Sequence, residues 1–124
     1  MKNFSQNIQE NYTFSGEHID IGVAVHENNI FTDTRVSIPL STLNRHGLIT
    51  GATGTGKTKT IQKLLERLSD AGVPSVMMDI KGDISGLSMP GEYSAKLQKY
   101  IDKFGNLEWK SRGFPVDFFS LLNE

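Results

Sequence analysis

The sequence predicts an α/β protein with a parallel-sheet core, preceded by a small β-hairpin module. The core is predicted because two short apolar runs, residues 48–50 and 75–80, flank a helical pattern at residues 57–71. Strand, helix and strand in this order form a unit whose strands are parallel and whose crossover is right-handed. The hairpin module is predicted because apolar residues alternate with other residues at 19–25 and again at 36–40.

The chain begins with a segment, residues 1–17, that is rich in Asn, Gln, Glu and Ser. This composition predicts a polar N-terminal arm that is disordered or loosely docked. Residues 18–42 are the predicted β-module, since the turn-forming sequence HENN separates its two alternating runs. Packing against the downstream core is the default role for this module. The alternating apolar residues are Ile19, Ile21, Val23, Val25, Val36, Ile38 and Leu40.

The connection between the first core strand and the helix is glycine-rich. Residues 47–60 read GLITGATGTGKTKT and contain the pattern G-x-x-x-x-G-K-[ST]. Glycines carry no Cβ, so successive backbone N–H groups can point at phosphate oxygens. Lys57 would bring a positive charge to the β- and γ-phosphates, and the Thr58 hydroxyl would bind Mg²⁺. A helix N-terminus favours the same anion. We therefore interpret the loop as a nucleotide P-loop rather than a flexible glycine turn.

The remaining core elements follow from spacing and punctuation. Gly72 is placed to end the first helix, and Pro74 prevents it from resuming. A Gly- and Ser-rich loop at 81–93 precedes a second helical pattern, with Ser94 as N-cap and Gly105 as C-cap. The apolar run FPVDFF, residues 114–119, is predicted to be another strand of the sheet. The face of the first helix is formed by Ile61, Leu64, Leu65 and Leu68.

Two further residues are candidates for the site. Asp79 ends an apolar run, and open α/β sheets bind ligands at the carboxyl ends of their strands. Its carboxylate is therefore expected near the Mg²⁺–phosphate site, although it could instead cap the strand or start the turn formed by residues 81–83. Arg45 precedes the first core strand and could reach a phosphate or a neighbouring subunit's nucleotide. A surface salt bridge is the ordinary alternative for this arginine.

Composition excludes several classes of protein. Lys and Arg total 13 and Asp and Glu total 14, so the formal net charge is −1. Without a basic excess, the chain alone is not expected to bind DNA. It has no cysteine, which excludes disulfides and cysteine chemistry. No apolar run is long enough for a membrane span and the N-terminus is too polar for a secretory signal, so we expect a soluble cytoplasmic protein.

The stretch that starts at Arg45, RHGLITGATGTGKTKTIQKLLERLSDAGVPSVMMDIKGDISGL, resembles the HerA-like P-loop ATPases. It is most similar to the helicase HerA-like (YjgR-type) group of the FtsK–HerA superfamily, and the resemblance covers about residues 43–120. It implies a P-loop NTPase (RecA-like) core and a parent that forms a homo-oligomeric ring and moves DNA. Residues 43–124 would be the front part of this core, which is incomplete because no strand ending in Asp-Glu follows Ile80.

The resemblance also implies a set of site residues for ATP or ADP with Mg²⁺. Lys57 and Asp79 would be catalytic, while Thr58 and Asp79 would contact the metal. The nucleotide-binding residues would be Arg45, Gly51, Ala52, Thr53, Gly54, Thr55, Gly56, Lys57, Thr58 and Thr60.

Three functions fit these observations. The first is an ATP-binding segment of a HerA-like DNA translocase, favoured by the KGD loop and by Arg45. The second is a small P-loop phosphotransferase in which Asp79 activates an acceptor hydroxyl. That enzyme would also need an arginine-bearing lid, and only Arg112 lies in the expected region. The third is a non-catalytic nucleotide-binding module.

Overall fold

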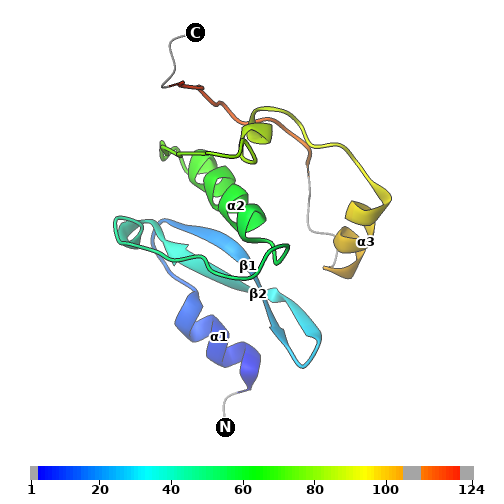
Figure 1. The fold of residues 1–124 in the computed structure, drawn as a ribbon. Coiled ribbons are helices and arrows are strands. Elements are labelled where there is room, and N and C mark those ends of the chain that lie inside the picture. The colour runs from blue at the N-terminus through cyan, green and yellow to red at the C-terminus, as the bar shows by residue number, and fades with distance from the viewer. Residues whose placement is uncertain (1–2, 105–109, 121–124) are drawn as a thin grey trace.

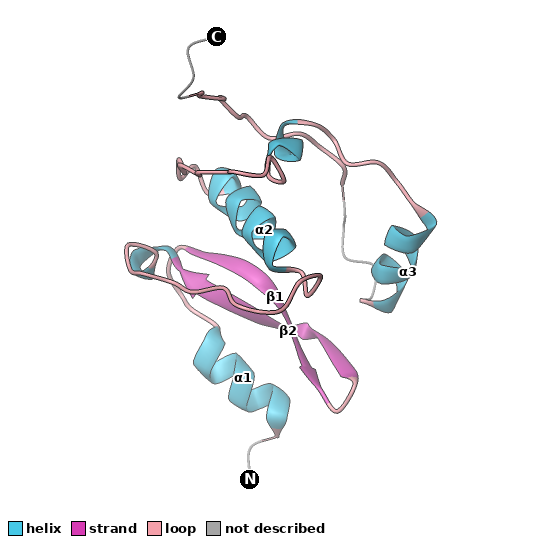
Figure 2. Ribbon diagram, viewed as in Figure 1, coloured by secondary structure: helices cyan, strands magenta, loops and turns pink. Residues whose placement is uncertain are grey.

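The computed structural model describes residues 3–104 and 110–120. Two antiparallel strands, β1 and β2, form a hairpin, and the helices α1 and α2 lie on opposite sides of it (Figures 1 and 2). Helix α3 stands apart from these layers (Figure 1). The elements in chain order are α1 (Phe4–Tyr12), β1 (His18–His26), β2 (Asn29–Pro39), η1 (Leu40–Thr42), α2 (Lys57–Asp70), η2 (Ser85–Ser88) and α3 (Ala95–Lys103), where η marks a short 3₁₀ helix.

The hairpin confirms the paired strands that the alternating pattern predicts. Its turn is formed by Glu27 and Asn28, whose φ angles of 48° and 65° are both positive. This is the backbone of a type I′ turn, whose twist matches that of two antiparallel strands. Within the pair, Ile19 lies opposite Ile38, and Ile19 is one of the few fully buried side chains. The alternation does not set the whole register, because the pairing shifts between Asp20 and Gly22 and again between Val23 and Ala24, and Ala24 is buried while Val25 is exposed.

The predicted polar arm contains a helix. Asn3 caps α1, since its side chain accepts the Gln6 N–H at 2.8 Å while the Gln6 side chain accepts the Asn3 N–H at 3.1 Å. This reciprocal capping box satisfies two N–H groups that a helix start leaves unpaired. Phe4 then stacks on His26, with ring centroids 4.5 Å apart, and contacts Phe31. The cap stabilises the start of the helix, and the aromatic contacts dock it on the hairpin.

Helix α2 confirms the helix predicted over residues 57–71. Gly56 precedes it with a φ of 98°, a left-handed conformation that favours glycine. The helix ends in a Schellman motif: the Gly72 N–H donates to Ser69 O at 3.0 Å and the Val73 N–H to Leu68 O at 2.9 Å. Its apolar face is half-buried and packs on β1. The helix thus follows the glycine-rich loop in the chain and joins it to the hairpin through its packing on β1.

The predicted parallel sheet is wrong. Among the described residues the only sheet is the β1–β2 hairpin, and the three segments predicted to be core strands, 48–50, 75–80 and 114–119, form no strand. Their apolar side chains are largely in solvent: Leu48 is 87% exposed, and Val76, Met78 and Ile80 are 99, 91 and 101% exposed. Apolar runs favour extended backbone locally, but a strand exists only when another segment pairs with it.

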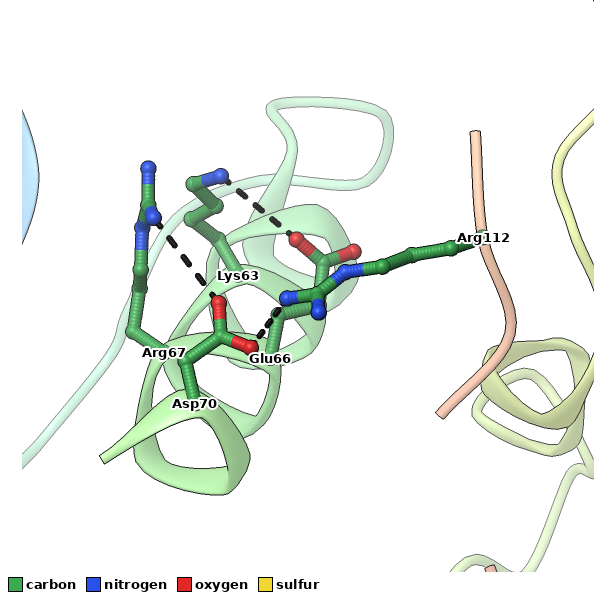
Figure 3. A network of polar contacts seen from close by, with 5 residues as sticks. All are labelled: Lys63, Glu66, Arg67, Asp70 and Arg112. Carbon is green, nitrogen blue, oxygen red and sulfur yellow. Dashed lines mark hydrogen bonds and ion pairs between the residues drawn. The ribbon is translucent and has the colours of Figure 1, made fainter. Parts of the chain in front are cut away.

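The C-terminal described segment is attached to α2 and η2 instead of to a sheet. The Arg112 guanidinium pairs with the Asp70 carboxylate at the last turn of α2, as Figure 3 shows. Arg67 approaches the other oxygen of Asp70, at 3.9 Å. The Phe114 N–H donates to Leu87 O at 2.9 Å, so the segment also touches η2. These contacts hold residues 111–114 at the end of α2 that is opposite to the glycine-rich loop.

Helix α3 begins where the sequence predicts. The Ser94 side chain accepts the Leu97 N–H at 3.2 Å, which confirms Ser94 as the N-cap. The predicted C-cap, Gly105, lies outside the described residues.

Candidate phosphate-binding site

The glycine-rich loop lies at the N-terminus of α2 and is exposed to solvent from Gly51 to Gly56 (Figure 2). Gly56 is the N-cap residue of α2, and no side chain caps the helix there. The first four N–H groups of a helix have no partner inside it, and the helix dipole places partial positive charge at the same end. The end of α2 that faces the loop is therefore suited to an anion.

The carbonyl oxygen of Ala52 is the centre of the loop's hydrogen bonds. It accepts the Lys57 ammonium at 2.7 Å, the Thr55 hydroxyl at 2.7 Å and the Thr55 N–H at 3.4 Å. The loop thus curls around the charged group of Lys57. The loop itself therefore holds the positive charge of Lys57 beside the N-terminus of α2.

Close packing across the loop requires a glycine at position 51. A Cβ added to Gly51 would lie 2.6 Å from the Thr55 hydroxyl oxygen, well inside van der Waals contact. By contrast, nothing lies within 4 Å of a Cβ added to Gly54 or Gly56. The spacing of the motif therefore has two separate causes, which are steric at Gly51 and conformational at Gly56.

The Asp79 carboxylate is bound by its own loop. Its Oδ1 accepts the N–H groups of Lys81 at 3.2 Å and Gly82 at 3.0 Å, and its Oδ2 accepts the Ile84 N–H at 2.7 Å. These hydrogen bonds, led by that from Ile84, lower the pKa of Asp79 below its usual value of 3.8 against a smaller opposing effect of burial. The geometry matches the turn that the sequence offered as the alternative, and the predicted magnesium role of Asp79 stays a prediction.

One contact that the sequence reading missed joins this loop to α2. The Gln62 side-chain amide donates to the Asp83 carbonyl oxygen at 2.9 Å. The loop of residues 79–84 therefore lies against the helix that starts at Lys57. A glutamine in the second turn of a helix is an ordinary surface residue, so nothing in the sequence signals this pairing.

The other predicted site residues lie at different positions relative to the glycine-rich loop. Thr58 lies in the first turn of α2 and is half-buried, and the Thr60 hydroxyl donates to Gly56 O at 3.2 Å. Arg45 is exposed at a bend before the loop, and within the described residues its guanidinium makes no hydrogen bond or ion pair. Arg112 pairs with Asp70 at the opposite end of α2. Arg112 is thus not near the loop in the way a lid arginine would be.

In the described ranges no three His, Cys, Asp or Glu side chains cluster closely enough to hold a metal ion. Magnesium in nucleotide sites needs only one or two protein ligands, because phosphate oxygens and water supply the rest. None of the helices in residues 3–104 and 110–120 has the length and hydrophobicity to cross a bilayer.

Comparison with known proteins assigns the family. No curated protein matches the chain, and no solved structure does. A family model described as helicase HerA-like C-terminal matches residues 25–124, a range that includes β2, the glycine-rich loop, α2 and the Asp79 loop. This match covers most of the chain and confirms the resemblance seen in the sequence. The chain belongs to the helicase HerA-like family.

Proposed function

We propose that this chain is the nucleotide-binding segment of a HerA-like ATPase, and that the loop from Gly51 to Thr58 binds the phosphates of ATP or ADP. The family is one of helicase-like ATPases. The observation that carries the proposal is the meeting of two positive groups at one exposed loop. These are the Lys57 ammonium, 2.7 Å from Ala52 O, and the uncapped N-terminus of α2.

Each residue of the motif has a role that its chemistry supports. Backbone N–H groups of the loop and of the first turn of α2 would bind phosphate oxygens. Lys57 would bind the β- and γ-phosphates, and the Thr58 hydroxyl would be a magnesium ligand. Magnesium would bridge the phosphate oxygens and neutralise part of their charge. Thr60 would support the loop through Gly56 O, and Arg45 would bind the nucleotide from outside the loop.

We further propose that residues 43–124 act within a longer ATPase that forms a homo-oligomeric ring and moves DNA in the cytoplasm. The family assignment supports these features of a parent protein. The chain itself has a formal net charge of −1, so DNA binding would need surfaces of the assembled parent.

A phosphotransferase is the weaker candidate. It would need an arginine close to the transferred phosphate, and Arg112 is instead paired with Asp70 at the far end of α2. It would also need Asp79 to accept a proton, whereas the carboxylate accepts backbone N–H groups that favour its charged form. Both observations favour nucleotide binding without phosphoryl transfer to an acceptor.

Calorimetry with ADP and ATP in the presence of magnesium tests the proposal. Lys57→Ala should weaken binding at least tenfold, because a charge-assisted contact to phosphate contributes about 1.5–3 kcal/mol. Lys59→Ala is the matched control, since Lys59 lies in the same turn of α2 but outside the motif, and it should bind like the wild type. Equal affinities of the wild type and Lys57→Ala would contradict the proposal.

A further inference from the structure

We propose that Asp79 is a positioning residue, which folds the loop of residues 79–84 so that Gln62 can bind it and hold the nucleotide-binding helix α2 in place. This inference rests on the proposed nucleotide-binding function. It gives Asp79 a role different from that of a magnesium-side acid.

The first step is the folding of the loop by the carboxylate. Both oxygens of Asp79 accept backbone N–H groups, two at Oδ1 and one at Oδ2. Gly82 supplies the left-handed backbone that the turn needs, with a φ of 76°. Hydrogen bonds to a charged acceptor are among the stronger ones in proteins. The Asp79 side chain thus makes three of the hydrogen bonds that hold residues 81–84, and the Ser85 hydroxyl adds one to Gly82 O at 2.7 Å.

The second step is the contact between this loop and α2. Gln62 donates to the Asp83 carbonyl, and that carbonyl can face Gln62 only while the loop keeps its turn. The contact is directional, and it joins residues that are far apart in the sequence. The position of Gln62, and with it the side of α2, therefore depends on the conformation of the Asp79 loop.

The third step concerns how firmly α2 is held. None of its 14 residues is fully buried and residues 61–69 are all half-buried, so packing alone restrains the helix weakly. The hydrogen bond from Gln62 therefore adds a directional restraint to this packing. Because Lys57 and Thr58 form the first turn of the same helix, rotation or sliding of α2 would move them relative to the loop.

The occupied carboxylate also explains why a positioning role fits better than metal binding. A carboxylate has about four lone-pair positions, and three are used by the N–H groups of Lys81, Gly82 and Ile84. To bind Mg²⁺ with good geometry, Asp79 would have to give up part of this turn. A positioning role requires no such change.

The test measures ADP affinity by calorimetry, with and without magnesium, for Asp79→Asn, Gln62→Leu and the double variant. Asparagine offers a single acceptor oxygen, so it loses either the Ile84 contact or those with Lys81 and Gly82 while keeping the size of the side chain. Each single variant should weaken ADP binding about threefold to tenfold, by the same factor in both conditions. The double variant should bind ADP as tightly as the single variant with the lower affinity, because both changes break the same connection. Amide exchange at residues 81–84 should speed up in Asp79→Asn before any nucleotide is added.

Asp83→Asn is the matched control, since only the backbone carbonyl of Asp83 contacts Gln62 and its side chain can change without breaking the bond. It should bind ADP like the wild type. Loss of only the magnesium-dependent part of binding in Asp79→Asn would identify a metal-side acid and overturn the inference. Faster exchange at residues 81–84 with unchanged ADP affinity would also overturn it, since the conformation of the loop would then have no effect on nucleotide binding. A wild type that binds no nucleotide would instead reject the proposed function itself.

Discussion

The ammonium of Lys57 lies 2.7 Å from the carbonyl oxygen of Ala52, within its own loop. A phosphate that enters the loop must compete with this neutral carbonyl for the cation. Both hydrogen bonds have a charged donor, but the phosphate oxygen also carries negative charge, so the Coulomb attraction favours the phosphate. The internal hydrogen bond therefore keeps the lysine near the site without blocking it.

Substitution of Gly51 tests how closely the loop is packed. Gly51→Ala should weaken ADP binding about tenfold, because its Cβ would lie 2.6 Å from the Thr55 hydroxyl and force the loop apart. Adding Thr55→Ala removes that oxygen and should recover part of the affinity. Gly47→Ala is the control, since nothing lies within 4 Å of a Cβ at that position. Calorimetry that gives Gly51→Ala the affinity of the wild type would argue against this loop geometry.

The Asp79 loop should open in acid. The pKa of Asp79 is lowered from 3.8 in the folded protein, so its contribution to stability is fully present above that value. It is lost as the pH falls through the lowered folded pKa. Amide shifts of Lys81, Gly82 and Ile84, followed by NMR from neutral pH downward, should change together with a midpoint below pH 3.8. Asp79→Asn should show no such step, and a step near pH 5 would disagree with the geometry.

Gly113→Ala should detach the C-terminal described segment from η2. Its Cβ would overlap the backbone carbonyl of Ser88, which cannot rotate away as a side chain could. Overpacking against fixed atoms typically costs about 1–3 kcal/mol, so amide exchange at Phe114 should become faster. Gly86→Ala, whose Cβ meets nothing within 4 Å, is the control. Unchanged exchange at Phe114 in Gly113→Ala would rule out this docking.

Arg112→Ala should leave nucleotide binding unchanged. The Arg112–Asp70 pair is partly exposed and lies at the end of α2 away from the loop, so its loss should cost less than about 1 kcal/mol of stability. That small effect should shrink further as salt is added. Chemical unfolding and ADP calorimetry on the same preparation would check both statements. A tenfold loss of ADP affinity would place Arg112 near the phosphates and revive the phosphotransferase.

The parts of the fold that the sequence predicts correctly are determined by residues close together in the chain. The ends of α2 depend on Gly56 and Gly72, and the hairpin turn on two residues, Glu27 and Asn28, that accept positive φ. The motif at residues 51–58 likewise predicts a phosphate-binding role for Lys57 from local sequence alone, and that role stays a prediction. Helix α1 also has a local signal, the capping box of Asn3 and Gln6, whereas the polar composition of residues 1–17 predicts a disordered or loosely docked arm.

The parts that could not be predicted depend on distant partners. Residues 75–80 have the composition of a buried strand, but composition does not say which segment pairs with them. The Gln62–Asp83 contact depends on how the Asp79 loop is folded. For Asp79 itself both roles were foreseen. Its hydrogen bonds to Lys81 and Gly82 match the turn, while the metal role is a matter for experiment.

The exposed segment that contains Val76, Met78 and Ile80 governs the behaviour of this chain in concentrated solution. Among the described residues its backbone makes no backbone hydrogen bond, so each molecule offers an unprotected template to its neighbours. A net charge of −1 provides almost no repulsion between molecules. The chain should therefore precipitate as its concentration rises, even at temperatures at which the hairpin stays folded. A lysine at position 76 or 78 would act as a gatekeeper that keeps the protein in solution.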